Sequence, residues 1–358
     1  MQFALDEDRA LLARSTRELL EKEAPLATNR QIMESEPSGY SKALFRQLGE
    51  LGYPSLLLNE AEGGLGPVAF AAVLQEMGRV ALPGPFLDLA LAIRVLAGCG
   101  ADAAKPWLAR ASAGEALVVL ARGESLASGD PSAPSASFTN GRVRGLKRFV
   151  PFGAEADALI VEAANGLALV EKPAGGWNAK ALPTIDHAQR FAELALDAPG
   201  ELLCDAAAAR AALDEVDRLA ALGASALLLG LSERALEITL AYTQERQAFG
   251  VPIASFQALQ HRAADMLLQT ESTRAAVYRA AFAAEHQPEQ AAYLIAVAKA
   301  WSGPAARLVC GEALQMHGGV GFTWEYDPHV YLKRVKTLEQ FYGSTRAQLE
   351  RVLQSRGW

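Results

Sequence analysis

The chain has 358 residues, which suffices for two or three domains with a substantial core. Its formal net charge of -7 and isoelectric point near 5.4 argue against nucleic acid as a partner. The three cysteines are odd in number and far apart in sequence, which predicts free thiols in a cytoplasmic protein without a metal site. We expect no membrane span and no secretory signal, because no apolar run reaches the roughly 18 residues that cross a bilayer and the N-terminus lacks an apolar core.

Residues 1–115 predict an N-terminal α-helical domain. Acidic residues at 6–8 favour the start of a helix, and the leucines that follow recur near helical spacing. Further helices are expected at 40–51, 68–78 and 86–96. The glycine-rich stretch 59–67 fits either a phosphate-binding loop or a tight turn between packed helices.

Residues 116–204 predict a small central β-domain. Short apolar or alternating runs are separated here by Gly, Pro, Asn and Asp, and we expect strands at 116–121, 158–161, 167–170 and 191–196. The pair Asn140-Gly141 is typical of a two-residue hairpin turn. The Ser- and Pro-rich segment 125–137 predicts a mobile loop.

Residues 205–358 predict a C-terminal helical bundle. Four helices are expected, at 205–246, 255–285, 288–314 and 344–353, and the first has a possible internal restart at 232–234. The order of helices, a β-domain and then four more helices is uncommon, and no internal repeat accompanies it.

The stretch 245–260 joins the first two of these helices. Gly250 suits the left-handed cap of a helix, and Pro252 discourages the helix from continuing. Arg246 can grip a phosphate with two parallel hydrogen bonds, Phe249 offers a flat apolar face, and Gln257 offers an amide. This combination suits an anionic, ring-containing cofactor, and the alternative is an ordinary interhelical turn.

Motifs in the same half of the chain have a familiar order and spacing. Arg246-Gln247-Ala248-Phe249-Gly250 is similar to an R-x-x-F-G motif, and residues 315–322 are similar to Q-x-x-G-G-x-G-[FY]. An acidic-aromatic pair at 325–326 follows, and residues 48–66 are similar to an N-terminal "LGELG … GG-G" stretch. Together with the order of elements, these motifs resemble the acyl-CoA dehydrogenase family over essentially the whole chain.

The resemblance implies an α+β fold: an N-terminal helical domain, a small β-barrel-like domain and a C-terminal four-helix bundle that binds FAD and mediates oligomerisation. It also implies α,β-dehydrogenation of an acyl-CoA thioester, a dimer or tetramer, and electron-transfer flavoprotein as electron acceptor. Arg246 and Phe249 would reach the FAD of a neighbouring subunit, with Arg246 on its pyrophosphate. The other positions implied to meet this cofactor are Gln257, Gln315, Gly318, Gly319 and Thr345. For His261 and His317, packing or hydrogen bonding is expected in preference to catalysis.

The base that takes the α-proton in this family has no counterpart here. Most members carry it in a Y-E-G-T sequence, to which Phe341-Tyr342-Gly343-Ser344-Thr345 corresponds, so that the base position falls on Gly343. A minority place it about 26 residues before the motif arginine, and this position is Ala220. Glycine and alanine do not accept a proton. Asp217 and Glu339 are the nearest acids, and each is more readily explained as a solvated helix face.

The predicted β-domain also departs from the family. Phe149 and Pro151 replace a Trp and a Thr that usually lie against the flavin, and the segment 125–137 replaces a Gly-Ser-Asp sequence. Phe149 can still cover a ring, but Pro151 has neither hydroxyl nor N–H. These departures put the chain's own flavin pocket in doubt.

The combined pattern resembles the base-lacking subunit of heteromeric bacterial acyl-CoA dehydrogenases that act on steroid side chains, in which an α2β2 assembly shares its sites. Two alternatives stay open: an active homomer with a displaced base such as Asp217, and a non-catalytic scaffold that keeps the fold. The sequence does not determine the acyl length or sterol nature of the substrate.

Overall fold

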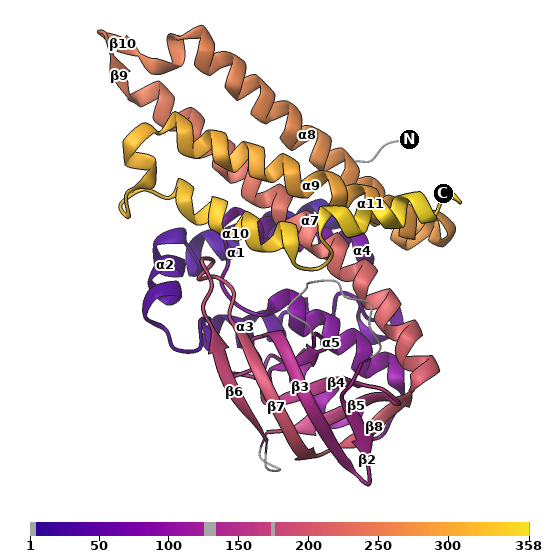
Figure 1. Ribbon diagram of the computed structural model, residues 1–358. Coiled ribbons are helices and arrows are strands. Elements are labelled where there is room, and N and C mark those ends of the chain that lie inside the picture. Colours follow the sequence, from indigo (N-terminus) through magenta and orange to yellow (C-terminus); the bar gives the residue numbers. More distant parts are fainter. Residues whose placement is uncertain (1–4, 125–133, 173–175, 358) are drawn as a thin grey trace. The chain divides into compact units, whose positions relative to one another are not determined.

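The computed structural model describes residues 5–124, 134–172 and 176–357 (Figure 1). The chain divides into two compact units. The first contains Met1–Asn29, Ala71–Leu82 and Ala221–Trp358, and the second contains Arg30–Phe70 and Pro83–Ala220. Helices α4 (Gly66–Arg79) and α7 (Ala206–Glu245) contribute to both units. The three-domain division at residues 115 and 204 stays a prediction.

The second unit combines short helices with two sheets. Its helices are α2 (Leu26–Ser35, of which the part from Arg30 belongs here), α3 (Lys42–Glu50), α5 (Phe86–Cys99) and α6 (Ala104–Ser112), with the 3-10 turns η1 (Tyr53–Ser55) and η2 (Glu60–Glu62). Helix α5 is buried on nearly all sides, as its almost continuously apolar sequence requires. The glycine-rich stretch 59–67 forms η2 and a left-handed turn at Gly63, so it is a tight turn between elements.

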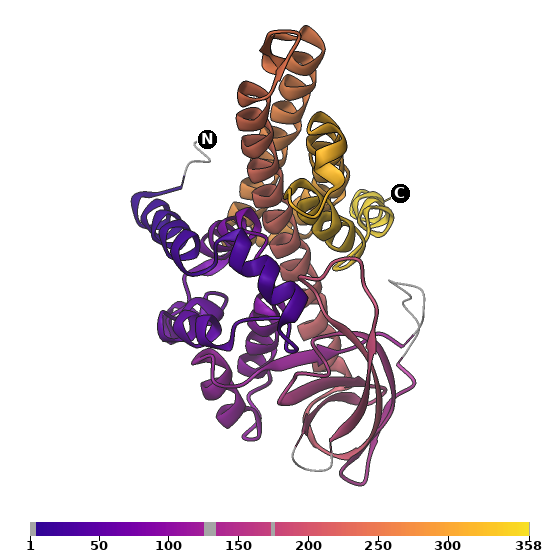
Figure 2. The same ribbon diagram turned by 90° about the vertical axis from the view of Figure 1, so that its left-hand side faces the viewer.

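Each sheet of this unit has four strands. One has the order β1 (Val118–Ala121), β4 (Ala158–Ala163), β5 (Gly166–Glu171), β8 (Glu201–Asp205), with β1 parallel to β4. The other is antiparallel, in the order β2 (Ser137–Thr139), β3 (Arg142–Pro151), β7 (Phe191–Pro199), β6 (Trp177–Leu182). Figure 2 shows the strands curving around one another, as the expected barrel-like domain requires. The four strands predicted from the sequence are present as β1, β4, β5 and β7.

The hairpin predicted at Asn140-Gly141 is confirmed. The two residues have φ of +51° and +71° and connect β2 to β3, with Thr139 opposite Arg142. Segment 125–133, most of the predicted loop, lies outside the described residues. The rest of that prediction was partly wrong, because the strand β2 begins at Ser137.

The first unit is mostly helical. It contains α1 (Glu7–Glu23), the C-terminal part of α4 from Ala71, and most of α7. The helices that follow are α8 (Gln257–His286), α9 (Pro288–Met316), α10 (Pro328–Gln340) and α11 (Thr345–Gln354). Helices α8 and α9 run side by side (Figure 1). The predicted restart at 232–234 is wrong, because α7 continues through it and Ser232 donates its hydroxyl to Leu228 O at 2.8 Å.

Two glycines bring α4 and α7 into backbone contact within this unit. A Cβ on Gly230 would lie 1.9 Å from Gln75 O, and one on Gly78 would lie 2.3 Å from Leu227 O. No side chain fits at such distances, so each helix presents bare backbone to the other.

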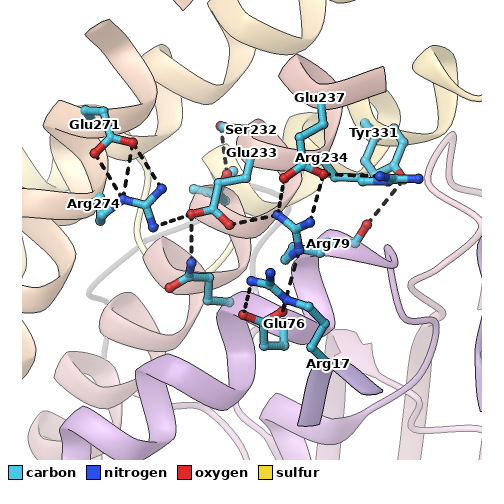
Figure 3. A network of polar contacts seen from close by, with 12 residues as sticks. Arg17, Glu76, Arg79, Ser232, Glu233, Arg234, Glu237, Glu271, Arg274 and Tyr331 are labelled. Carbon is cyan, nitrogen blue, oxygen red and sulfur yellow. Dashed lines mark hydrogen bonds and ion pairs between the residues drawn. The ribbon is translucent and has the colours of Figure 1, made fainter. Parts of the chain in front are cut away.

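A charged network joins four helices of the same unit (Figure 3). Glu233 of α7, 6% exposed, accepts hydrogen bonds from Gln75 and Arg79 of α4 and pairs with Arg274 of α8 at 2.6 Å. Glu76 is bound by Arg17 of α1 at 2.8 Å. Burial alone would lower the pKa of Arg79, but the surrounding carboxylates outweigh it and raise that pKa. Breaking one partner of such a buried network costs about 3–5 kcal/mol, so these charges stabilise the helix packing only as a set.

One described helix, α7, is long and apolar enough to cross a membrane by length and composition, although 94% of its most apolar window is buried inside the protein. Such burial is what a core helix also shows. The three cysteines are free thiols, as predicted, although Cys99 and Cys204 come within 3.7 Å of each other. Among the described residues, no group of three or more acidic, His or Cys side chains could hold a metal ion.

Candidate functional site: an exposed hairpin, a glycine segment and a closed turn

The link between α7 and α8 is a small hairpin. Strands β9 (Gln247–Ala248) and β10 (Val251–Pro252) pair antiparallel, with Phe249 and Gly250 as the two-residue loop. Both loop residues have positive φ, +55° and +80°, as in the turns that match the twist of a hairpin. The left-handed Gly250 was expected. The hairpin was not, because two-residue strands have no periodicity to detect.

Phe249 lies at the tip of this hairpin and is 97% exposed. Its ring meets only the ring of Phe256 among the described aromatic residues, edge to face at 6.3 Å. A left-handed backbone costs a non-glycine residue about 1 kcal/mol, and exposure of a large aromatic side chain gives no compensation within the chain. The tip is therefore strained, apolar and open to a ligand or partner.

Arg246 lies at the base of the hairpin with its side chain exposed. Its N–H donates to Tyr242 O and its carbonyl accepts from Ile253 N, each at 2.8 Å, so its backbone is fixed. Neither its guanidinium nor the side-chain amide of Gln257 has a hydrogen-bond partner among the described residues. Both retain their full capacity to bind an anion or a polar ligand from outside.

A second exposed segment follows the end of α9. Gln315 is exposed, and Gly318 takes φ of +64° at the start of the turn η4 (Gly318–Phe322). No atom lies within 4 Å of a Cβ built on Gly318 or Gly319, so another molecule can approach this backbone closely.

The ends of α7 and α9 are joined by stacking. The ring of Tyr242 stacks on His317 at 4.3 Å, and its hydroxyl donates to His317 O at 3.4 Å. His317 is 5% exposed, donates Nδ1–H to Ala313 O at 2.7 Å, and has its pKa lowered by burial. It therefore supports packing, as expected. The contact places the hairpin and the glycine segment at one end of the helical unit.

The two positions at which the resemblance predicts a base carry no acid, and the neighbouring acids bind arginines. Gly343 lies between α10 and α11, and Ala220 is a buried residue of α7. The carboxylate of Asp217 pairs with Arg122, and that of Glu339, 6% exposed, accepts from Arg307 Nε at 3.1 Å. The expected solvated helix face is wrong for Glu339, which is buried, whereas the side chain of Asp217 stays partly exposed beside its arginine.

Two buried polar residues beside Gly343 were missed by sequence reasoning. Lys299 of α9 is fully buried and donates to the carbonyls of Gly343 and Glu339, at 2.8 and 3.2 Å. Burial lowers its pKa to about 8. Gln348 of α11 is 1% exposed. The only signal for Lys299 was a single cation in a small, apolar stretch of helix, and Gln348 had none.

Thr345, a predicted cofactor contact, lies at the start of α11. Its hydroxyl oxygen is buried and has no hydrogen-bond partner among the residues described. An unpartnered buried hydroxyl suits a polar group from a ligand.

In the second unit, Phe149 sits on a β-bulge of β3. The register shifts between Lys147 and Val150, and Phe149 takes φ of +52°. Its ring meets Phe191 edge to face at 6.5 Å. Pro151 ends the strand opposite Phe191. The bulge re-aims the Phe149 side chain, a local device often found near functional sites.

A buried ion pair lies next to this bulge. Lys147, with a fully buried side chain, donates to Arg122 O at 3.1 Å and pairs with Glu124. Glu124 also accepts hydrogen bonds from Ser135 and Ala136. Burial would raise the pKa of Glu124, but the Lys147 and Ser135 hydrogen bonds lower it to about 2. Glu124 is thereby linked to Lys147 and to the backbone of Ser135 and Ala136.

Comparison with known proteins extends over the whole chain. The profile of the acyl-CoA dehydrogenase N-terminal domain matches residues 6–115, and that of the C-terminal domain matches residues 216–356. The acyl-CoA dehydrogenase IpdE2 of Mycolicibacterium smegmatis is 34% identical over 351 residues, covering 97% of this chain and 98% of the relative.

Two solved structures have a similar fold. A steroid acyl-CoA dehydrogenase described as the Tcur3481-Tcur3483 G363A variant matches with a TM-score of 0.86, 29% identity and 99% of each chain covered. The ChsE4-ChsE5 complex from Mycobacterium tuberculosis matches with a TM-score of 0.87 and 26% identity, over 100% of this chain and 99% of the other. With these similarities, and with the helical, β and helical segments in the expected order, the chain belongs to the acyl-CoA dehydrogenase family.

Proposed function

We propose that this chain is a subunit of an FAD-dependent acyl-CoA dehydrogenase that lacks its own base and completes the FAD site of a base-bearing partner subunit. The observation that carries the proposal is the contrast between an exposed, unpartnered hairpin and glycine segment and a base position occupied by Gly343. The matches to two named two-component assemblies support a heteromer of α2β2 type.

The exposed residues fit a dinucleotide that comes from outside the unit. The guanidinium of Arg246 binds the pyrophosphate, since anionic oxygens and a planar fork of donors match in charge and geometry. Phe249 covers an apolar face of the cofactor, and the amides of Gln257 and Gln315 donate to its polar edges. Gly318 and Gly319 let the backbone come close. When bound, FAD supplies the redox chemistry of the α,β-desaturation.

The partner supplies the group that removes the α-proton of the acyl-CoA. Neither Gly343 nor Ala220 accepts a proton. Asp217 and Glu339 each form an ion pair with an arginine, and this pairing orients the carboxylate toward that cation. These contacts weigh against an active homomer with a displaced base. A steroid side-chain thioester is the substrate class that the similarity to a steroid enzyme favours, and electron-transfer flavoprotein is the electron acceptor.

Flavin content tests this proposal. The chain is expressed alone and together with a homologous acyl-CoA dehydrogenase subunit that carries the base, and bound FAD and dye-linked acyl-CoA oxidation are measured in both preparations. We expect FAD and turnover only from the assembled pair. Turnover from the chain alone would refute the proposal that the base comes from a partner subunit. Absence of flavin from both preparations would favour a non-catalytic scaffold.

Arg246→Ala in the assembled pair should lower flavin retention about 10- to 100-fold, because hydrogen bonds to a charged group contribute about 1.5–3 kcal/mol. Arg346→Ala is the matched control, since Arg346 is an exposed arginine on α11 that pairs with Glu350 of the same helix. Equal flavin retention in the two variants would show that Arg246 does not bind the flavin.

The variant Asp217→Asn tests the alternative of an active homomer. If the chain is active by itself, loss of turnover in this variant would identify Asp217 as the base.

A further inference from the structure

In the turn between α10 and α11, the side chain of Gln348 takes the space beside position 343, so a side chain at 343 requires Gln348 to shift. Tyr342 and Gly343 have φ of +60° and +95°. A Cβ built on Gly343 would lie 2.0 Å from Nε2 of Gln348, far inside van der Waals contact. A side chain at 343 would therefore meet both a strained backbone and the amide of Gln348.

Gln348 is an unfavourable residue for packing alone. Neither its Oε1 nor its Nε2 has a hydrogen-bond partner among the residues that the structure describes, although the side chain is 1% exposed. Burial of an unpartnered amide costs free energy that an apolar side chain of similar size would not. The nitrogen of this amide lies 2.0 Å from the place that a Cβ at 343 would take, so the amide occupies that space.

The turn is also held in place from the opposite side. The ammonium group of Lys299 donates to Gly343 O at 2.8 Å and to Glu339 O at 3.2 Å, and the side chain is fully buried. These two bonds fix Gly343 and the last turn of α10. The backbone at 343 thus has little freedom to move away from Gln348.

We propose that Gln348 closes the base position of this chain. Its neutral carboxamide occupies the space that a side chain at 343 needs, and Lys299 holds the turn in the closed form. This inference rests on the proposed function, in which the base comes from a partner. An amide takes up no proton, so the closed position has no proton acceptor. It follows that Gly343→Glu does not restore a base unless room is also made at 348.

Unfolding in urea tests the steric part, and it requires neither flavin nor partner. The midpoints are compared for the wild-type chain, Gly343→Glu, Gln348→Ala and the double variant. We expect Gly343→Glu to lower the midpoint in the wild-type background and to lower it less than half as far in the Gln348→Ala background. Equal losses in both backgrounds would overturn the proposal. Gln354→Ala, an exposed position on the same helix, is the control that should leave the loss unchanged.

Activity tests the chemical part, which a purely structural role of Gln348 would not affect. The same variants are assembled with a homologous subunit whose own base is replaced by glutamine, loaded with FAD, and assayed with butyryl-CoA and a steroid side-chain CoA thioester across pH. The double variant should exceed the Gly343→Glu rate at least tenfold, with a rate that rises through the titration of one carboxyl group. A single variant as active as the double, or a flavin-loaded double variant without activity, would overturn the proposal. If no preparation holds flavin, the proposed function fails, while the urea comparison still decides the role of Gln348.

Discussion

Two turns of the helical unit have the same local backbone and opposite surroundings. Phe249-Gly250 and Tyr342-Gly343 are each an aromatic residue followed by glycine, and all four residues have positive φ. No atom lies within 4 Å of the place that a methyl group on Gly250 would take, whereas Gln348 already fills that volume at Gly343. The first turn is open and faces outward, and the second is closed from within. The backbone alone therefore does not say whether such a turn binds a ligand or excludes one.

The largest effect should come from adding a methyl group to the closed turn. Gly343→Ala combines left-handed strain of about 1–3 kcal/mol with overpacking of about 1–3 kcal/mol. We expect the free energy of unfolding in urea to fall by about 4 kcal/mol. A fall near 1 kcal/mol would mean that the Gln348 amide swings away easily, and the contrast between the turns would then disappear.

A pH series examines the lysine that holds the closed turn. The pKa of Lys299 in the folded chain is about 8, below its ordinary 10.5, so the unfolded chain binds one more proton between these values. Stability should therefore rise with pH over this window, by about 3 kcal/mol when the wild type is compared with Lys299→Met. The measurement is urea unfolding of both proteins at pH 7.5, 9 and 10.5. A stability difference that stays constant with pH would contradict a buried lysine with a lowered pKa.

The open turn should tolerate the same methyl group far better. Gly250→Ala adds left-handed strain but meets no neighbouring atom, so we expect a loss of only about 1 kcal/mol in the same unfolding measurement. The two alanine variants form a matched pair, in which the difference isolates the space around the glycine. Equal losses at 250 and 343 would show that strain, not room, dominates both turns.

The smallest effect should be a gain. Asparagine tolerates the left-handed region better than phenylalanine, and Phe249 makes almost no contact within the chain. Phe249→Asn should therefore raise the free energy of unfolding by about 0.5 kcal/mol while it weakens flavin retention in the assembled pair. Calorimetry of the chain and flavin analysis of the pair give the two readings. A stability loss would place Phe249 in an internal role.

The sequence predicted most elements because their signals are local. A long helix such as α8 has uninterrupted helical composition, and Asn140-Gly141 has the turn chemistry that a tight hairpin needs. Strand β6 was missed because its residues are mostly exposed and show no alternation. Strand β3 was missed because four cations interrupt its apolar positions. Whether such stretches form strands depends on how they pack against the rest of the fold.

In the candidate site too, the sequence predicted features that are local in the chain and missed contacts between distant residues. Arg246, Phe249 and Gly250 were predicted because they are neighbours in sequence around one break. The association of Gly343 with Lys299 and Gln348 was not, because Lys299 lies 44 residues away on another helix and Gln348 acts only through its position in space. The pairing of Asp217 with Arg122, 95 residues distant, was missed for the same reason.

The contact of Gly230 with the backbone of α4 has a consequence at a distance. A slip of one residue along α7 would put a side chain where the two backbones touch. The contact between the helices therefore allows only one axial register of α7. Each residue of slip would move the end of α7 by about 1.5 Å and rotate it by about 100°. Glu245, where the helix ends, lies about 22 Å along the helix from Gly230. The absence of a side chain at Gly78 and Gly230 thus determines the direction in which the hairpin at the end of α7 points.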